Sequence, residues 1–416
     1  MGATRPEEQA RPSRMARVAR RWRPAVAAVL LVLVSFSAGV GLERRFPSAL
    51  PLPLPASRAD QFDQAKVQQA SRIIQANYYD AGVSGSRLSQ GSVRGMVDSL
   101  DDPFSQYLTP EQFRSQQDAV AGRHDGAIGV TVAFEQGYPV IAGLLPNSPA
   151  LRAGIQTDDV ILGVDGRDAH GLTPDQIATL IRGVDGSQVR LLLGRGTGQV
   201  EVAVTRARFQ SPTVESLRLP GDILYLRVYQ FGDGTEREFD DRLETGLTGA
   251  RGTVLDLRGN GGGLVSAAVA MVSRFVAAGV VFEERGRDGR TDRVPVDGDH
   301  PAATVALAVL VDGASASASE IVAGSLQAHR RGTLIGTRTF GKGSVQVAYE
   351  LRDGSAVNLT VQHWYLPDGR SINGSGLAPD VAVDLPRQTA MFDVVQPARG
   401  YAGDTQLRRA LEVLGG

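Results

Sequence analysis

Three apolar runs in the second half of the chain constrain its fold more than any other feature of the sequence. They cover residues 223–228, 253–257 and 304–311, and stretches with helical spacing of apolar residues separate them. Runs that are apolar throughout are typical of strands buried on both faces, and their alternation with helices favours an α/β sheet. A helix is predicted after the last run, over about residues 317–330. We therefore predict an α/β core here, α+β in detail and with a mixed sheet.

Two regions with other patterns precede this core. Residues 60–121 are rich in Gln and Arg and carry apolar residues at helical spacing, which predicts an N-terminal helical region. Residues 122–208 contain short alternating runs separated by glycine-containing turns, which predicts a small inserted β-rich domain. The other predicted divisions are a basic flank at 1–24, an apolar segment at 25–42, a Pro-rich linker at 43–59, the core at 209–390 and a C-terminal segment at 391–416.

The N-terminal segment predicts an exported protein. Seven Arg residues occur in the first 24 positions, and a charge-free run of 19 residues, 24–42, follows. About 20 apolar residues cross a membrane as a helix, and a basic flank stays in the cytoplasm. We therefore predict a single-pass signal anchor at 25–42, with the rest of the chain extracytoplasmic, in the periplasm. A cleaved signal peptide is the alternative, because residues 35–38 resemble a small-residue cleavage site, and it would give a secreted protein.

Composition excludes several classes of function. A net charge of −1 argues against a nucleic-acid partner, and the absence of Cys excludes disulfide frameworks, thiolate metal sites and cysteine nucleophiles. The five His residues have no metal-ligand spacing, so no metal or other cofactor is expected. Only two of the 44 basic residues are lysines, Lys66 and Lys342. Because Arg stays protonated, a chain that uses it elsewhere is expected to keep Lys where a proton must leave.

Three serines, Ser315, Ser317 and Ser319, lie between the third apolar run and the predicted helix. Helix N-termini leave backbone N–H groups unpaired and carry a partial positive charge. A serine there could attack a carbonyl group while the next N–H faces the developing oxyanion. The serines could instead only cap the helix, as serines commonly do, and this segment alone favours capping.

Two glycine-rich loops leave further alternatives open. Residues 259–263 suit a tight turn, a backbone hydrogen-bond donor or, with poor spacing, a dinucleotide loop. Residues 336–342 match the first seven positions of a P-loop, which would indicate a nucleotide hydrolase, but the eighth position is Gly343 instead of Ser or Thr. Lys342, beside Phe340, could instead lose its proton and act as a general base. No Ser–His pair or G-x-S-x-G elbow is indicated, which leaves a Ser–Lys arrangement.

Four segments occur in the order 101–108 (DDPFSQYL), 256–263 (DLRGNGGG), 315–321 (SASASEI) and 339–343 (TFGKG). Together they resemble the carboxyl-terminal processing proteases, the tail-specific serine proteases of peptidase family S41. The resemblance covers about residues 60–386 and implies a serine endopeptidase that cleaves near protein C-termini. It implies these site residues: the nucleophile Ser317, the base Lys342, Gln346 to orient that lysine, and the backbone N–H groups of Ala318 and Gly263 as oxyanion donors.

The spacing of two implied site residues constrains the backbone between them. Lys342 and Gln346 would lie about 13 Å apart on a straight strand. Gly343 must therefore bend the chain if their side chains touch. The pKa of a free lysine is about 10.4, and desolvation is the available cause that could lower it enough for a base near neutral pH.

The β-rich domain resembles a PDZ domain, on the segments 126–131, 147–155 and 158–166 and a helix near 173–182. Such a domain binds an extended peptide as an added strand and holds its terminal carboxylate with loop N–H groups, here those of Ile128, Gly129 and Val130. The implied partners are protein or peptide substrates with free C-termini. A catalytically silent PDZ scaffold is the alternative function, and a structural spacer is the alternative role of the domain.

Three further contacts are expected. The anchor at 25–42 would place one helix in a membrane, and the helical region 60–121 resembles a segment that its family uses for dimers, so a homo-oligomer is a candidate assembly. Arg182, at the end of the predicted PDZ helix, is a candidate contact to the protease core that reports peptide binding.

Overall fold

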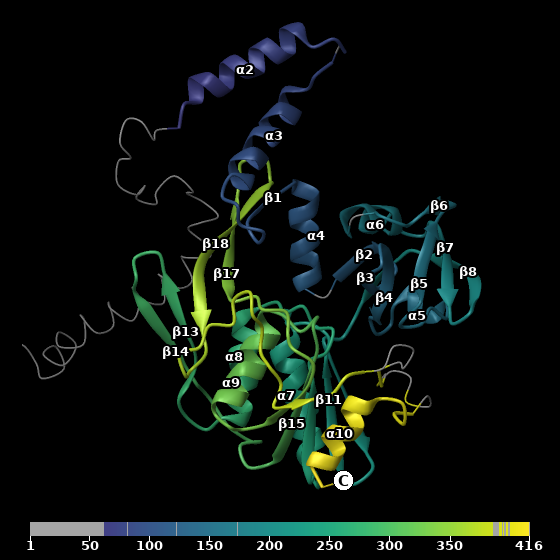
Figure 1. Ribbon diagram of the computed structural model, residues 1–416, viewed down its shortest axis with the longest axis vertical. Coiled ribbons are helices and arrows are strands. Elements are labelled where there is room, and N and C mark those ends of the chain that lie inside the picture. Colours follow the sequence, from purple (N-terminus) through teal and green to yellow (C-terminus); the bar gives the residue numbers. More distant parts are fainter. Residues whose placement is uncertain are drawn as a thin grey trace, which may run out of the picture.

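The computed structural model describes residues 62–80, 82–121, 123–172, 174–385, 391–392, 394, 397 and 400–415. A six-stranded sheet forms the core (Figure 1). Its strand order is β10 (Val214–Leu219), β11 (Ile223–Val228), β12 (Gly252–Asp256), β15 (Ala306–Val311), β16 (Thr333–Gly336) and β19 (Val381–Ala382). β10 is antiparallel to β11 and the other neighbours are parallel. The three apolar runs form β11, β12 and β15, which confirms the predicted core.

Both faces of this sheet are buried, because successive side chains of a strand point to opposite faces. Leu224 and Leu226 of β11 join a cluster with α7 (Thr235–Leu247), α8 (Val265–Phe275) and α9 (Ala318–Ala328). Ile223 and Tyr225 join a second cluster with α10 (Thr405–Val413), which lies on the opposite face. Fully burying one such leucine stabilises the fold by about 1.5–3 kcal/mol. Helices therefore sandwich the sheet.

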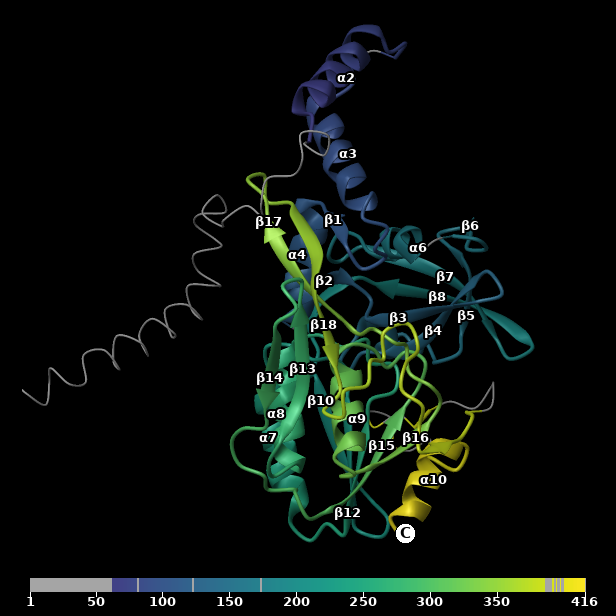
Figure 2. The same ribbon diagram turned by 60° about the vertical axis from the view of Figure 1, so that its left-hand side comes forward.

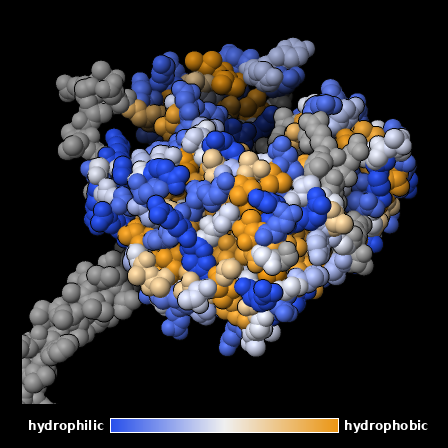
Figure 3. Space-filling view, turned by 60° about the horizontal axis from the view of Figure 1, so that its bottom comes forward, coloured by the Kyte–Doolittle hydropathy of each residue, from blue (hydrophilic) through white to orange (hydrophobic). Residues whose placement is uncertain are grey.

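The C-terminal helix α10 is amphipathic and belongs to the core. Leu407, Ala410 and Leu411 are buried, whereas Arg408 and Arg409 are exposed. The face shown in Figure 3 carries hydrophilic and hydrophobic residues interspersed over its surface.

A second sheet lies beside the core. It contains the hairpin that follows residues 337–343, the loop with Lys342, which we call the lysine loop. Its strands are β1 (Gln106–Leu108), β18 (Ala356–Tyr365), β13 (Val280–Gly286) and β14 (Thr291–Pro295), with β17 (Ser344–Glu350) also paired to β18. β17 and β18 are antiparallel, and their register shifts between Val345 and Gln346. β1 pairs with β18 from about 250 residues earlier in the chain, through Gln106 and Asn358. This pairing brings the segment 101–108 to the core.

The β-rich region forms its own sheet and its own apolar cluster. The strand order is β3 (Val130–Glu135), β4 (Tyr138–Leu144), β5 (Val160–Val164), β7 (Gln188–Arg195) and β8 (Gly198–Thr205), with β6 (Arg167–Asp168) paired to β5. Helices α5 (Pro149–Arg152) and α6 (Pro174–Ile181) complete it. Strands β2 (Arg123–Ala127) and β9 (Ala207–Gln210), which precede and follow this sheet in the chain, pair with each other. This region is inserted between the N-terminal helices and the core, as predicted.

In the part of the chain that the structure describes, three helices precede the β-rich region: α2 (Gln64–Asn77), α3 (Gly85–Asp98) and α4 (Pro110–Val120). Asp63, Ser84 and Thr109 cap their N-termini with side-chain oxygens, as such residues commonly do. α2 and α3 project away from the rest of the chain in both ribbon views (Figures 1 and 2). α2 has no buried residue. The predicted N-terminal helical region is confirmed.

The predicted location is corrected. No helix in the described part of the chain is long and apolar enough to cross a membrane. The predicted anchor at 25–42 lies outside the described residues. The predicted single-pass membrane location is therefore not supported by the described residues.

Candidate active site

Ser317 lies at the turn between β15 and α9, where it is the N-cap residue of the helix. Its φ of 57° and ψ of −117° lie in a region that non-glycine residues rarely occupy. Such strain persists only where the surroundings enforce it, and it is common at functional sites. The side chain is half-buried. The first N–H groups of α9, beginning with that of Ala318, have no partner within the helix, so the serine oxygen lies at a positive helix end.

One buried carboxylate joins residues 312–317, the turn with Ser317 that we call the serine turn, to the lysine loop. Glu320, which is fully buried, accepts hydrogen bonds from the backbone N–H groups of Ser317 at 2.9 Å and Lys342 at 2.8 Å. It also accepts from the Gly341 N–H at 2.7 Å and the Thr339 hydroxyl at 2.6 Å. Sequence reasoning assigned Glu320 no role, although a Glu three residues after an N-cap serine is the capping-box signal that could have identified it.

The environment of Lys342 suits a base. Burial lowers the pKa of its amine, and the negative charges of Asp102 and Glu320 oppose that shift without cancelling it. The Nζ atom lies 5.4 Å from the ring centroid of Phe104. The Lys342 carbonyl oxygen accepts a hydrogen bond of 3.1 Å from Trp364 Nε1, which fixes the backbone at this point. Desolvation is the cause that the sequence predicted.

The glycine loop 259–263 lies directly against the serine turn. A Cβ atom on Gly262 would lie 2.8 Å from Ser317 Cβ and 3.0 Å from the Ala318 backbone nitrogen, so only glycine fits. The Gly262 N–H donates to the Asn260 side-chain oxygen at 2.9 Å and is therefore engaged. Gly263 has a φ of 139° and forms a bridge with Phe231 of the loop after β11. The structure thus brings Gly263, Ala318 and Ser317 into one region.

Asn260 holds the two loops together and was missed by sequence reasoning. It is fully buried, and its backbone oxygen accepts from the Ala316 N–H at 3.0 Å and the Ser319 hydroxyl at 2.8 Å. Its side-chain amide donates to the Val228 carbonyl at 2.9 Å. The DLRGNGGG pattern contains this residue, but these partners, Val228, Ala316 and Ser319, are 32 or more positions away, so the pattern gave no signal for them.

Gln346 lies on β17, and the structure gives it other partners than the one predicted. Its amide nitrogen donates to the hydroxyl groups of Ser344 at 2.8 Å and Thr360 at 3.0 Å. In the described part of the chain, no hydrogen bond joins Gln346 to Lys342. The register of β17 and β18 shifts between Val345 and Gln346, whereas the bend that a contact would need was predicted at Gly343.

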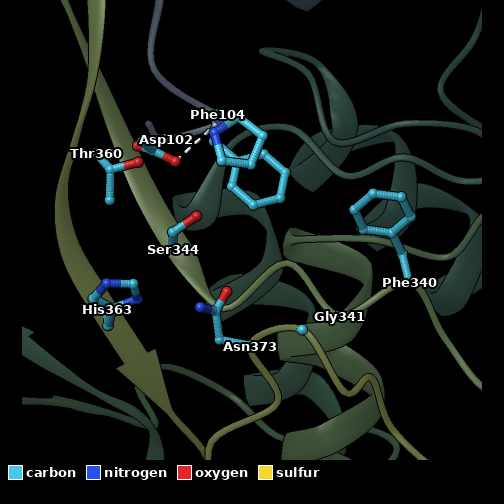
Figure 4. Close-up of a pocket in the computed structure, with 10 residues that line it drawn as sticks. Asp102, Phe104, Phe340, Gly341, Ser344, Thr360, His363 and Asn373 are labelled. Atoms are coloured by element: carbon cyan, nitrogen blue, oxygen red, sulfur yellow. Dashed lines mark hydrogen bonds between the residues drawn. The ribbon is translucent and has the colours of Figure 1, made fainter. Parts of the chain in front are cut away.

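A pocket of about 610 Å³ adjoins the lysine loop (Figure 4). Phe104 and Phe340 form part of its wall, with ring centroids 6.4 Å apart. Asp102 also lines it, and although burial opposes ionisation, hydrogen bonds from Ser105 and Thr360 lower the pKa of its carboxyl group. Asp102 also accepts a hydrogen bond from the Phe104 N–H at 3.1 Å. Its position in this pocket was not predicted.

The predicted carboxylate-binding loop lies beside an edge strand. β3, which begins at Val130, is the terminal strand of its sheet, so its outer edge can accept another strand. Gly129 has a φ of 76°, and a Cβ atom there would lie 2.3 Å from Ser148 Cβ, so glycine is required. The carbonyl groups of Ile128 and Gly129 accept from the N–H groups of Ala150 and Leu145, which fixes the loop.

Two other sequence interpretations can be compared with the structure. Lys342 is followed by strand β17 and not by the helix that a P-loop requires, which argues against nucleotide binding. Arg182 donates from Nη1 to the Ser115 hydroxyl of α4 at 2.5 Å, so it contacts the N-terminal helices. In the residues that the structure describes, no group of three His, Cys, Asp or Glu side chains could hold a metal ion.

Three stretches of the chain match models of known families. Residues 222–383 match peptidase family S41, and residues 140–195 match a PDZ domain. Residues 54–112 match the N-terminal domain of the activating protease CtpB. The first stretch contains the serine turn, the lysine loop and the glycine loop.

Relatives and solved structures agree with these matches. A Staphylococcus aureus protein named "Probable CtpA-like serine protease" is 34% identical over 351 residues, which make up 84% of this chain and 70% of the relative. A Staphylococcus haemolyticus protein of the same name is 33% identical over 340 residues, 81% of this chain and 68% of the relative. The structure of the photosystem II D1 C-terminal processing protease matches with a TM-score of 0.59 and 28% identity, over 78% of this chain and 94% of that one.

Proposed function

The chain belongs to peptidase family S41, as a C-terminal processing serine protease with a PDZ domain, and from this premise we propose that Ser317 and Lys342 form its catalytic dyad. The observation that carries the proposal is the Glu320 carboxylate, which binds the backbone N–H groups of both residues. A shared buried acceptor keeps the two loops in register, which a dyad from separate segments requires. The strained Ser317 backbone and the lowered pKa of Lys342 support the same roles.

The dyad accounts for each proton in the reaction. Ser317 Oγ attacks the peptide carbonyl carbon while neutral Lys342 accepts the hydroxyl proton. The tetrahedral intermediate collapses, and the departing amine takes that proton from the lysine. Water then attacks the acyl ester, again with the lysine as base, and releases the acid and the free serine. Arginine could not act in this way, because it stays protonated at ordinary pH.

The N–H groups of Ala318 and Gly263 are the proposed oxyanion donors. Ala318 supplies the first N–H of α9, which no residue of the helix can accept. Gly262 already donates to Asn260, so its neighbour is the better candidate on the facing loop. Two donors at the position of the developing charge are the usual arrangement in acyl transfer, and removing one typically slows the reaction about 100-fold or more.

Gln346 enters the proposal as a residue that shapes the wall of the pocket. Its bonds hold Ser344 and Thr360, and both residues line the pocket beside the lysine loop (Figure 4). These bonds use only the amide nitrogen, so the direct contact with Lys342 that the family resemblance implies would have to be made by the amide oxygen.

We further propose that the PDZ domain, at about 122–208, captures substrate C-termini for the core at about 209–390. The edge of β3 would pair with the substrate strand, and the N–H groups of Ile128, Gly129 and Val130 would hold its carboxylate. Peptides with a free C-terminus should then bind and be cleaved better than amidated copies of the same sequence. Equal cleavage of the two peptides would exclude carboxylate capture.

A second copy of the chain is the proposed partner of the N-terminal helices. Phe62, Ile73, Ile74 and Tyr78 are exposed on or beside α2, which buries none of its own residues. Exposed apolar faces of this kind are typical of association surfaces. Sedimentation of the full chain should show a dimer that Ile73→Asp dissociates; a wild-type monomer at micromolar concentration would contradict this assembly.

One experiment separates the proposed function from its alternatives. Wild type and Ser317→Ala are incubated with an unstructured protein, and fragments are identified by mass spectrometry. The proposal predicts fragments from the wild type alone. A silent PDZ scaffold would bind peptide and yield no fragments from either protein. A nucleotide hydrolase would show Mg²⁺-dependent nucleotide turnover in a parallel assay.

A further inference from the structure

A buried cluster of charges joins the C-terminal helix to the glycine loop of the active site. Arg258 and Asp256 are fully buried, and Asp404 is 1% exposed. The Arg227 Nη1 atom lies 2.6 Å from Asp256 Oδ1 and completes the cluster. Two guanidinium groups thus face two carboxylates. Buried charges are tolerated only when they are paired and hydrogen-bonded in this way.

Arg258 lies at the centre of the cluster and makes bidentate contacts with both carboxylates. Its Nε and Nη2 atoms donate to Asp256 at 3.0 and 2.6 Å, and its Nη1 and Nη2 atoms donate to the two oxygens of Asp404 at 2.9 Å each. The other Nη1 proton goes to the Gln406 side-chain oxygen at 3.0 Å. All five guanidinium protons are therefore satisfied, which fixes the side chain in position and orientation.

The backbone of Arg258 opens the loop that faces Ser317. The next residue, Gly259, donates its N–H to the Asp312 carboxylate at 2.9 Å. Asn260 follows and accepts hydrogen bonds from the serine turn. Gly259 is the one residue between Arg258 and Asn260, and its bond to Asp312 holds it in place, so a displacement of Arg258 moves the glycine loop relative to the nucleophile.

Asp404 holds the arginine from a different part of the chain. It is the N-cap of α10, and its two oxygens also accept the N–H groups of Leu407 and Phe392 at 2.9 Å each. α10 is anchored in turn, because Leu407 and Ala410 are fully buried. These residues lie beyond position 383, where the match to the S41 family model ends.

We propose that Asp404 is a positioning residue for proteolysis, which holds Arg258 and thereby keeps the glycine loop at the distance from Ser317 that oxyanion stabilisation needs. The C-terminal helix is then part of the catalytic apparatus. This inference rests on the proposed function, since the loop affects the reaction rate only if Ser317 is the nucleophile.

The test replaces Asp404 by a side chain of the same shape without charge. Asp404→Asn can keep the oxygen that caps α10 at Leu407, while its NH₂ group replaces the oxygen that accepts from Arg258 Nη2 and from the Phe392 N–H. The matched control is Asp159→Asn in the PDZ domain. Asp159 is equally buried, binds Arg195 through both oxygens at 2.7 and 2.6 Å, and also accepts a backbone N–H, from Gln156.

The main readout is the rate at which a fluorophosphonate labels Ser317. In this reaction the serine oxygen bonds to phosphorus, fluoride leaves and the hydroxyl proton passes to the base. Thermal melting, together with kcat and KM on one peptide, is measured in parallel. Asp404→Asn should lower the labelling rate and kcat by about tenfold or more with little change in KM, because it disturbs an oxyanion donor. Asp159→Asn should lower the melting temperature and leave labelling unchanged.

Two results would overturn the inference. One is a folded Asp404→Asn protein that is labelled at the wild-type rate. The other is wild-type labelling of Gln406→Met, which applies if Asp404→Asn does not fold. Gln406→Met removes one acceptor of Arg258 without a change in charge and should therefore slow labelling. Failure of the proposed function itself looks different, because wild type and Ser317→Ala would then be labelled alike.

Discussion

Glu320 offers the sharpest perturbation of the site, because one carboxylate accepts four hydrogen bonds there. Its Oε2 atom accepts the N–H groups of Ser317 and Lys342, and its Oε1 atom accepts the Gly341 N–H and the Thr339 hydroxyl. Glu320→Gln preserves the shape of the side chain and replaces one of these oxygens by an NH₂ group, which cannot accept a hydrogen bond.

The structure predicts how the new amide orients. With its NH₂ group at the Oε2 position, the N–H groups of both Ser317 and Lys342 would lose their acceptor. At the Oε1 position only the Gly341 N–H loses one, because the Thr339 hydroxyl can accept. Hydrogen bonds to charged groups contribute about 1.5–3 kcal/mol each, so the second orientation is preferred and costs about that much stability. If the same loss fell on the transition state, kcat would fall by about 10-fold to 150-fold.

The assay is kcat on a peptide substrate together with thermal unfolding. Glu238→Gln on α7 is the matched control, because Glu238 Oε2 accepts two backbone N–H groups and a hydroxyl from Thr213 and Val214 outside the site. Both variants should lose stability, and only Glu320→Gln should lose kcat. A folded Glu320→Gln enzyme with wild-type kcat would refute the role assigned to this carboxylate.

Two further predictions concern the lysine and the glycine loop. Because neutral Lys342 is the base, kcat/KM should be lost as pH falls through the pKa of its amine, with a midpoint below the ordinary value of about 10.4. Asp102→Asn should move this midpoint to still lower pH, because the charge of Asp102 raises that pKa. An unshifted midpoint in the variant would contradict the assignment. Gly262→Ala should lower kcat by about tenfold or more, because the added Cβ would lie 2.8 Å from Ser317 Cβ. Gly249 is the control position, because it has the same type of positive φ in open space, so Gly249→Ala should lower stability alone. Equal kcat in the two variants would count against the loop contact.

The sequence predicts those features that local pattern determines. Nearly continuous apolar runs identify β11, β12 and β15, because most positions of a strand buried on both faces are apolar. Contiguous motifs likewise single out Ser317 and Lys342 as candidates. The PDZ-like region follows from its short alternating strands and glycine turns.

Partners that are distant in the chain could not be predicted in the same way. Asp102 reaches the pocket only because β1 pairs with β18, and no local pattern encodes that pairing. Arg258 and Asp404 are 146 positions apart and carry charges, which sequence patterns assign to the surface by default. Gln346 shows the converse case, since the register of β17 and β18 gives it Ser344 and Thr360 as partners.

The central claim is that Lys342 activates Ser317, and one measurement tests it most directly. Wild type, Ser317→Ala and Lys342→Arg are each treated with a fluorophosphonate, and the adduct is located by mass spectrometry after digestion. The account predicts one adduct, on Ser317, in the wild type and none in either variant, although Lys342→Arg melts like the wild type. Labelling of Ser317 in Lys342→Arg at the wild-type rate would contradict the account, because an arginine cannot accept the proton of the serine.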